Sequence, residues 1–363
     1  MKILVYGAGP LGSLLAARLV EGGQDVSILA RGQRLLDLRK HGIILHDIQT
    51  GAWTETSLLV VENLASGDDY DLALVIMRKN HALEILPVLA ANRKIPNILF
   101  LMNNAKGPGE LVEALGRERV LIGFPNAAGY RRGPVIHYLA GNEEQPSRIP
   151  IGEIDGVIRP RTLDIVAALE QAPGFGVELR PDMDAWLKYH VALLIPSIAP
   201  ALYACGADHQ RLARTRDAVL LAVRAAREGF TVLRSLGYPT TPSRFQPLTW
   251  LPEPILVPLI RRFLRNEWIE VALVKHALAA PDEMLHLAEE FQLLIARSGC
   301  ATPYIDRLHA CFDPDTPQIP DGSRELSMDW RSILLGLGVT AALGGMAGII
   351  RRRLMQEPFS GEG

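Results

Sequence analysis

The sequence predicts an α/β protein, in which an N-terminal doubly wound sheet is followed by an all-helical C-terminal domain. Three observations carry this prediction. A glycine-rich motif joins an apolar run to a helical pattern at the N-terminus, and further short apolar runs alternate with helical patterns through the first half. Beyond Arg180 the chain changes to long Ala/Leu/Arg-rich stretches broken by prolines. We therefore expect a sheet domain over 1–180, a helical domain over 181–312, and a linker with an apolar tail over 313–363.

The glycine motif follows the apolar run Lys2–Tyr6 and consists of Gly7, Ala8, Gly9, Pro10, Leu11 and Gly12. The order predicts a strand, a tight turn and a helix. Gly7 permits the turn, Gly9 lets a pyrophosphate approach the backbone, and Gly12 lets helix and strand pack closely. The helix N-terminus offers unpaired N–H groups to an anion. A glycine-rich turn without a ligand is the alternative, but the strand-to-helix context favours a Rossmann-type dinucleotide site.

The residues at the end of the second strand indicate whether the cofactor is NAD or NADP. The strand begins at Asp25 and ends in Ala30-Arg31-Gly32-Gln33-Arg34, without a carboxylate. Sites that prefer NAD usually place Asp or Glu at this point, whereas an arginine clamps the 2′-phosphate of NADP. Arg31, with Arg34 as a second candidate, therefore predicts NADP. The alternative is that Arg31 is an ordinary surface charge.

Composition and charge argue against a nucleic-acid-binding protein and against a disulfide-rich or metal-binding one. A formal net charge of −2 over 363 residues gives no basic field for a nucleic acid. The three cysteines, Cys205, Cys300 and Cys311, form neither a metal-ligand spacing nor a disulfide framework. No signal peptide precedes the first strand. We expect a cytoplasmic protein without a metal site.

The remaining elements are predicted from apolar periodicity. Further strands are expected at Val26–Leu29, Leu58–Val61, Leu72–Ile76, Ile98–Leu101, Val120–Phe124, Val135–Tyr138 and Ile149–Gly152. Helices are expected at Pro10–Glu21, Ala82–Leu89, Gly109–Leu115, Arg211–Leu236, Glu253–Ala279 and Asp282–Arg297, the last stopped by Ser298-Gly299.

The C-terminal tail is apolar and uncharged from Ile333 to Ile350 and is followed by three arginines, Arg351–Arg353. This pattern has the length of a membrane span with a cytoplasmic stop signal. A buried helix or a flexible glycine-rich tail would give a similar composition. Membrane association through 333–350 and burial within the protein both stay open, and a tail anchor would leave the other domains in the cytoplasm.

From Met1 to about Leu308 the layout resembles the ketopantoate reductase family. The resemblance rests on five features in order: the motif Gly7–Gly12; Arg31; the turn Leu101-Met102-Asn103-Asn104-Ala105-Lys106-Gly107; Trp186-Leu187-Lys188; and Glu283, which precedes Ser298–Pro303. The family implies NADPH-dependent reduction of a 2-oxo acid to a 2-hydroxy acid. Its default reaction is the reduction of 2-dehydropantoate to pantoate, a step of pantothenate biosynthesis.

The resemblance also implies roles for individual residues. Hydride transfer to a 2-oxo group leaves negative charge on the carbonyl oxygen, which a lysine ammonium can polarise and protonate. By resemblance Lys188 is this general acid, and Glu283 holds the ammonium and binds a substrate hydroxyl. Asn104 lies between cofactor and substrate in the family, and Arg78 aligns with a basic residue near the cofactor phosphates, with Lys79 as a neighbour that could substitute.

The pocket departs from the family pattern. Ala192, Pro196 and Val271 replace polar residues that would contact the substrate, and Asn126 and Ser197 are the candidate replacement contacts. Loss of hydrogen-bonding partners should relax or redirect specificity. Three hypotheses follow: a 2-oxo acid reductase, a reductase of a more apolar carbonyl substrate, and an NADP-binding protein without turnover. The apolar helices are also compatible with a homodimer.

Overall fold

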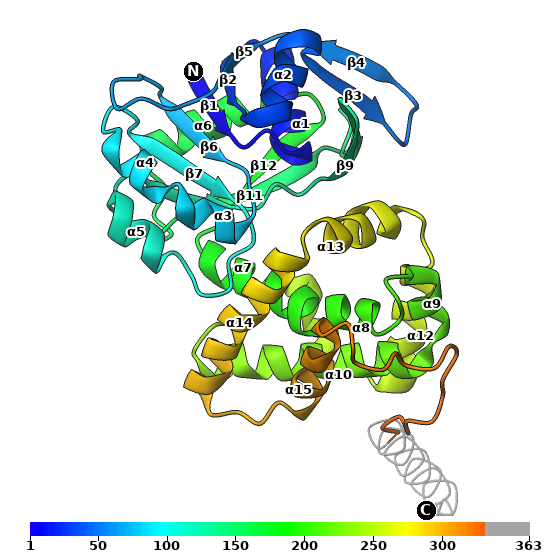
Figure 1. Cartoon of the computed structure of the whole chain (residues 1–363). Helices are drawn as coiled ribbons and strands as arrows, with labels where there is room; N and C mark the ends of the chain where they lie inside the picture. Colours follow the sequence, from blue (N-terminus) through cyan, green and yellow to red (C-terminus); the bar gives the residue numbers. More distant parts are fainter. Residues whose placement is uncertain (331–363) are drawn as a thin grey trace, which may run out of the picture.

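The computed structural model describes residues 1–330, which form a sheet-containing N-terminal part and a helical C-terminal part (Figure 1). The main sheet has eight strands in the order β12-β11-β8-β7-β6-β1-β2-β5. Their bounds are β1 Lys2–Tyr6, β2 Asp25–Leu29, β5 Leu59–Val61, β6 Leu72–Val75, β7 Asn97–Leu101, β8 Val120–Gly123, β11 Ser147–Glu153 and β12 Phe175–Leu179. All neighbours pair in parallel except β11 and β8, which are antiparallel.

Apolar side chains of the main sheet are buried on both of its faces. Ile3 and Val5 of β1 belong to one core cluster, whereas the alternate residues Leu4 and Tyr6 belong to another. Because successive side chains of a strand point to opposite faces, both faces are covered, as a doubly wound sheet requires. The helices of this part are α1 Pro10–Glu21, α2 Gly32–His41, α3 Lys79–Glu84, α4 Leu86–Ala91, α5 Gly109–Leu115 and α6 Pro160–Leu169. The predicted fold class is confirmed.

A second, four-stranded sheet lies beside the first. It has the order β4-β3-β10-β9, with bounds β3 Ile43–Asp47, β4 Trp53–Thr56, β9 Ala128–Arg132 and β10 Val135–Leu139. The predicted strand at Val135–Tyr138 is therefore real but belongs to this small sheet, where β10 pairs antiparallel with β9 and parallel with β3. Strands β3, β4, β9 and β12 and helices α2 and α6 were not predicted, because their short or strongly polar segments lack clear periodicity.

The C-terminal part is helical around the long helix α10. Its elements are α7 Met183–Leu193, η1 Leu194–Ile198, α8 Ala199–Tyr203, α9 His209–Arg214, α10 Arg216–Ser235, η2 Ser243–Phe245, α11 Gln246–Trp250, α12 Glu253–Leu264, η3 Glu270–Val274, α13 Lys275–Ala279, α14 Pro281–Ser298, α15 Pro303–His309 and η4 Ala310–Phe312. Gly299 ends α14 in the left-handed conformation, as predicted for this stop. The boundary expected near residue 180 falls between β12 and α7 and stays a prediction.

Three predicted helices are interrupted. The helix expected at 211–236 breaks at Thr215, whose backbone is extended and whose hydroxyl accepts from the Gly322 N–H at 3.1 Å. The helix expected at 253–279 ends at Leu264 and resumes as η3 and α13. The helix expected at 82–89 divides at Ile85, which caps a new helix that begins at Leu86 and has Pro87 in its first turn. Each break depends on a local backbone change that apolar periodicity does not register.

Among the described residues, one helical segment, Met183–Tyr203, is long and apolar enough to cross a membrane by length and composition. However, 78% of its most apolar window is buried inside the protein. Buried core helices have the same composition, so this segment is part of the protein core. The apolar tail 333–350 lies outside the described residues.

Candidate functional site

The glycine motif forms a tight loop between β1 and α1. Gly7 has a φ of 126°, and a Cβ placed on it would overlap the carbonyl oxygen of Ile76. A Cβ on Gly12 would overlap the carbonyl oxygen of Gly7, so α1 packs directly on the turn. In contrast, nothing lies within 4 Å of a Cβ placed on Gly9, and no side chain caps the helix that begins there. This open approach to an uncapped helix N-terminus suits the pyrophosphate of a dinucleotide.

The two arginines after β2 have different surroundings. Arg31 is exposed, and its Nη2 donates to the Tyr6 hydroxyl at 3.0 Å. Arg34 is nearly buried beneath the glycine loop, where its guanidinium donates to the Ala8 carbonyl and to Ser13 Oγ. Burial lowers the pKa of Arg34 to about 10. Arg31 is therefore accessible to a 2′-phosphate, whereas Arg34 supports the loop that would hold the pyrophosphate.

Helix α7 connects the two cores and carries Lys188 between them. Trp186 and Leu187 pack in a cluster of the main sheet, and Tyr189 packs in the core of the helical part. Lys188 is 1% exposed, and its ammonium pairs with Asp184 one turn earlier on the helix. Burial lowers the pKa of Lys188, although Asp184 opposes this change. A buried ammonium with a lowered pKa is suited to donate a proton.

The turn after β7 lies against Lys188. Gly107 has a φ of 100°, and a Cβ placed on it would lie 2.9 Å from Lys188 Nζ and 3.2 Å from Asp184 Oδ1. Asn104 is 1% exposed, and its Oδ1 accepts from the Gly107 N–H at 2.9 Å. The structure thus brings Asn104 and Lys188, two residues predicted to act together, to the same turn.

Lys79 begins α3 and is fully buried. Its Nζ donates to Asn104 Oδ1 at 2.8 Å and lies 3.0 Å from Glu290 Oε1. The other Glu290 oxygen accepts from the N–H groups of Ala105 and Lys106, each at 3.2 Å. Lys79 was predicted only as a substitute for Arg78 near the phosphates. Its ammonium instead lies inside the junction, between the turn and α14.

Glu283 lies close to the same group of residues. It is 2% exposed and accepts from the backbone N–H of Lys79 at 3.4 Å. Burial raises the pKa of Glu283, whereas the Lys79 N–H, Arg78 and the Asn103 side chain lower it. Arg78 pairs with Asp282 at 2.8 Å and also donates to the Ala279 carbonyl. These contacts join Arg78 to the end of α13 and to the start of α14.

The two candidate replacement contacts, Asn126 and Ser197, make local hydrogen bonds. Asn126 follows β8 with a φ of 40° and donates to the Arg148 carbonyl at 2.8 Å. The Ser197 hydroxyl is buried and donates to the Leu193 carbonyl of its own helix. Among the described residues, these hydrogen bonds do not join either side chain to Lys188 or Asn104. Ala192 packs in the helical core, 3.3 Å from a Cβ placed on Gly229.

Sequence reasoning missed three residues of the junction, Asp184, Asn103 and Glu290, and it missed the inward position of Lys79. Asp184 could have been found, because it lies four residues before Lys188 on one helix face. Asn103 stands next to Asn104 in the turn. Glu290 carries no such signal, since its contact with Lys79 joins residues that are far apart in the chain.

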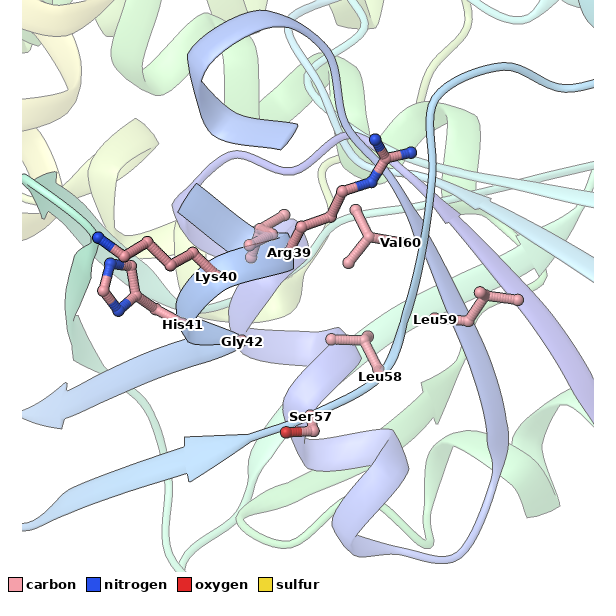
Figure 2. Close-up of a pocket in the computed structure, with 9 residues that line it drawn as sticks. Arg39, Lys40, His41, Gly42, Ser57, Leu58, Leu59 and Val60 are labelled. Carbon is pink, nitrogen blue, oxygen red and sulfur yellow. The ribbon is translucent and has the colours of Figure 1, made fainter. Parts of the chain in front are cut away.

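A surface hollow of about 450 Å³ lies elsewhere, between the end of α2 and β5. Arg39, Lys40 and His41 line it at the end of α2 together with Ser57 to Val60, and the Arg39 side chain extends toward Val60 (Figure 2). It contains none of the predicted site residues. Within residues 1–330, no group of three or more His, Cys, Asp or Glu side chains is placed to hold a metal ion.

Comparison with curated proteins finds distant relatives. The chain is 27% identical to an uncharacterized oxidoreductase, YkpB, of Bacillus subtilis over 195 residues, which are 52% of this chain and 61% of that protein. It is 27% identical to a 2-dehydropantoate 2-reductase of Pyrococcus horikoshii over 144 residues, which are 34% of this chain and 48% of that protein. The chain therefore spans less than two thirds of the length of these two curated relatives.

Solved structures share the fold over most of the chain. A PanE/ApbA family ketopantoate reductase from Ralstonia eutropha has a TM-score of 0.68 at 17% identity and covers 86% of this chain and 97% of its own. D-mandelate dehydrogenase with NADH and anilino(oxo)acetate has the same TM-score at 15% identity, with the same coverage. A dimeric ketopantoate reductase from Staphylococcus aureus has a TM-score of 0.61 at 13% identity, again over 86% and 97% of the two chains.

The N-terminal part also matches a family model. The model described as ketopantoate reductase PanE/ApbA covers residues 3–156, which hold the glycine loop, Arg31, Lys79 and Asn104. Residues 3–156 thus match the ketopantoate reductase PanE/ApbA family of oxidoreductases, and the chain is similar to distant members of that family.

Proposed function

We propose that this protein reduces a 2-oxo acid to a 2-hydroxy acid with NADPH, and that Lys188 is the general acid. The observation that carries the proposal is the surroundings of Lys188. A buried lysine ammonium lies at the junction of the two parts, against the turn that holds Asn104. Lysines are rarely buried without an ion-pair partner or a functional role. Lys188 is also the residue that the sequence predicts as the proton donor.

The bound nicotinamide would supply a hydride to the carbonyl carbon of the substrate. Lys188 would hydrogen-bond the carbonyl oxygen, stabilise the negative charge that develops there and transfer its proton to that oxygen. Asp184 would hold the ammonium in place through the contact it already makes. Glu283 would bind a substrate hydroxyl, and Asn104 would contact both cofactor and substrate. By family default the substrate is 2-dehydropantoate, and its reduction to pantoate is a step of pantothenate biosynthesis.

The cofactor proposal rests on the glycine loop and on Arg31. Gly7, Ala8, Gly9, Pro10, Leu11 and Gly12 would surround the pyrophosphate at the N-terminus of α1. The exposed guanidinium of Arg31, at the end of β2, would pair with a 2′-phosphate and favour NADPH. The related D-mandelate dehydrogenase was solved with NADH, so preference between the two cofactors must be measured. Arg78 is less suited to the phosphates, since Asp282 already neutralises it.

The deciding experiment follows NADPH and NADH oxidation by absorbance with 2-dehydropantoate and a panel of other 2-oxo acids. Lys188→Ala should lower kcat by about 10²–10⁴-fold, because the proton donor is lost. NADPH binding, measured by fluorescence titration, should be retained. Lys94→Ala, a change at an exposed lysine of the sheet part, is the control for loss of a charge. A wild-type protein that binds NADPH but turns over none of the acids would refute the proposal and favour the binding protein.

A second candidate function has the same chemistry with a bulkier, more apolar 2-oxo acid. It is favoured by Ala192 and Pro196, which are buried where the family carries polar side chains. Turnover of an aryl 2-oxo acid without turnover of 2-dehydropantoate would support this alternative. A homodimer, as described for the S. aureus ketopantoate reductase, and a cytoplasmic location are part of the proposal.

A further inference from the structure

Lys79 is the most completely buried charged side chain of the junction, and the proposed reaction assigns it no role. Its residue is 0% exposed, and two of its three ammonium protons are accounted for by Asn104 Oδ1 and Glu290 Oε1. Burying an ammonium is costly unless it is paired and hydrogen-bonded, and here both conditions are met. The charge of such a group should affect the orientation and the pKa of the side chains around it.

Its most direct effect is on the side-chain amide of Asn104. Oδ1 of this amide accepts two hydrogen bonds, from Lys79 Nζ at 2.8 Å and from the Gly107 N–H at 2.9 Å. Two donors on one side define the rotamer, because the flipped amide would place Nδ2 against an ammonium. Nδ2 is thereby left as a buried donor, and no group of residues 1–330 accepts from it. A buried donor without an acceptor is expected where a bound molecule supplies one.

We propose that Lys79 is a positioning residue: its ammonium, held by Glu290, fixes the Asn104 amide so that Nδ2 is presented to the bound cofactor or substrate. Glu290 is suited to this task because its second oxygen is itself held by the Ala105 and Lys106 N–H groups. The turn, α3 and α14 therefore form one hydrogen-bonded unit around the Asn104 side chain. The inference rests on the proposed function for its effect on rate.

Lys79 also affects the proton affinity of Lys188. The charged and titratable groups around Lys188 are Asp184 on its own helix, the Tyr238 ring 4.8 Å from Nζ, and Lys79 and Glu290 beyond the turn. Burial is the largest cause of the lowered pKa of Lys188; Asp184 and Glu290 raise this pKa, and Lys79 lowers it further. Removing Lys79 and removing Glu290 should therefore move the titration of Lys188 in opposite directions.

The test uses the full-length variants Lys79→Met, Glu290→Gln and the double variant, with Lys94→Met as a control at an exposed lysine. Lys79→Met should lower kcat by about 10²-fold, as a misplaced contact in an active site does, and KM for NADPH should change less. Either single variant removes the 3.0 Å ion-pair partner of a buried charge and should lower Tm, although His286 still lies 3.5 Å from Glu290 Oε1 in Lys79→Met. The double variant should regain Tm, because the pair is removed together, and should keep the low kcat.

A readout independent of turnover is the ¹³Cε NMR titration of Lys188 in labelled protein. Its midpoint should rise in Lys79→Met and fall in Glu290→Gln. A double variant with wild-type kcat would overturn the inference, because Lys79 and Glu290 would then only stabilise the fold. Unchanged midpoints in both single variants would also overturn it. If the wild type turns over no 2-oxo acid, the proposed function fails, and the midpoints alone decide whether Lys79 acts on the site.

Discussion

Single residues of the junction owe their properties to burial and to the charges around them. Lys188 and Glu283 are both nearly inaccessible, and burial disfavours the charged form of each: it lowers the pKa of the lysine and raises that of the carboxyl. The two values therefore move toward each other. Enzymes use burial to raise the pKa of a carboxyl or to lower that of a lysine where the group transfers a proton near neutral pH.

The pH dependence of kcat/KM should report the lowered pKa of Lys188. The general acid must be protonated, so activity is complete below this pKa and falls as pH rises through it. Because burial lowers the pKa, the fall should begin below the ordinary lysine value of about 10.4. Asp184→Asn removes one of the two carboxylates that raise the pKa of Lys188 and should move the fall to lower pH. A profile that stays flat up to the ordinary lysine range would rule out Lys188 as the acid.

At the scale of elements, the turn between β1 and α1 gives Gly12 and Gly9 different roles. Gly12 is required by packing, because a Cβ there overlaps the Gly7 carbonyl. Gly9 is not required by the fold, since its φ is −71° and nothing lies within 4 Å of a Cβ placed on it. Its small size instead leaves room for a ligand on the helix N-terminus.

This difference predicts opposite outcomes for two matched substitutions. Gly12→Ala should destabilise the fold by about 1–3 kcal/mol, because helix and strand must separate. Gly9→Ala should leave Tm within a degree or so of the wild type, given a surface change of small effect, and should weaken NADPH binding. Thermal unfolding and fluorescence titration measure the two quantities. Equal binding of NADPH by Gly9→Ala and wild type would argue against a pyrophosphate at this loop.

At the scale of the whole molecule, the segment 313–330 ties the helical part together without forming a helix or strand. The buried carboxylate of Asp217, at the start of α10, accepts from the Ser323 hydroxyl at 2.6 Å and from the Glu325 N–H at 2.6 Å. Glu253, at the start of α12, accepts from the Asp329 N–H at 2.8 Å. The segment predicted as a linker is thus bound to two helices.

Truncation should separate this segment from the tail that follows it. Removing 313–363 exposes Asp217 and Glu253 without their partners, and we expect a large fall in Tm. Asp217→Ala alone should cost on the order of 3 kcal/mol, since several hydrogen bonds to a buried charge are lost together. Removing only 331–363 keeps these contacts and should lower Tm less than removing 313–363 does. Calorimetry of the three proteins tests this, and equal Tm values for both truncations would contradict it.

The sequence by itself determined the fold class, the strand-turn-helix of the glycine loop and most strands of the main sheet. It also singled out Lys188, Asn104 and Glu283, whose roles stay predictions. These depend on local signals: apolar periodicity, glycine spacing and a family-like order of motifs. Only the tertiary structure decided that Val135–Leu139 joins a second sheet and that Lys79 faces Glu290 inside the junction. Both result from pairing between distant segments, whose burial and charge balance exist only once the chain is folded.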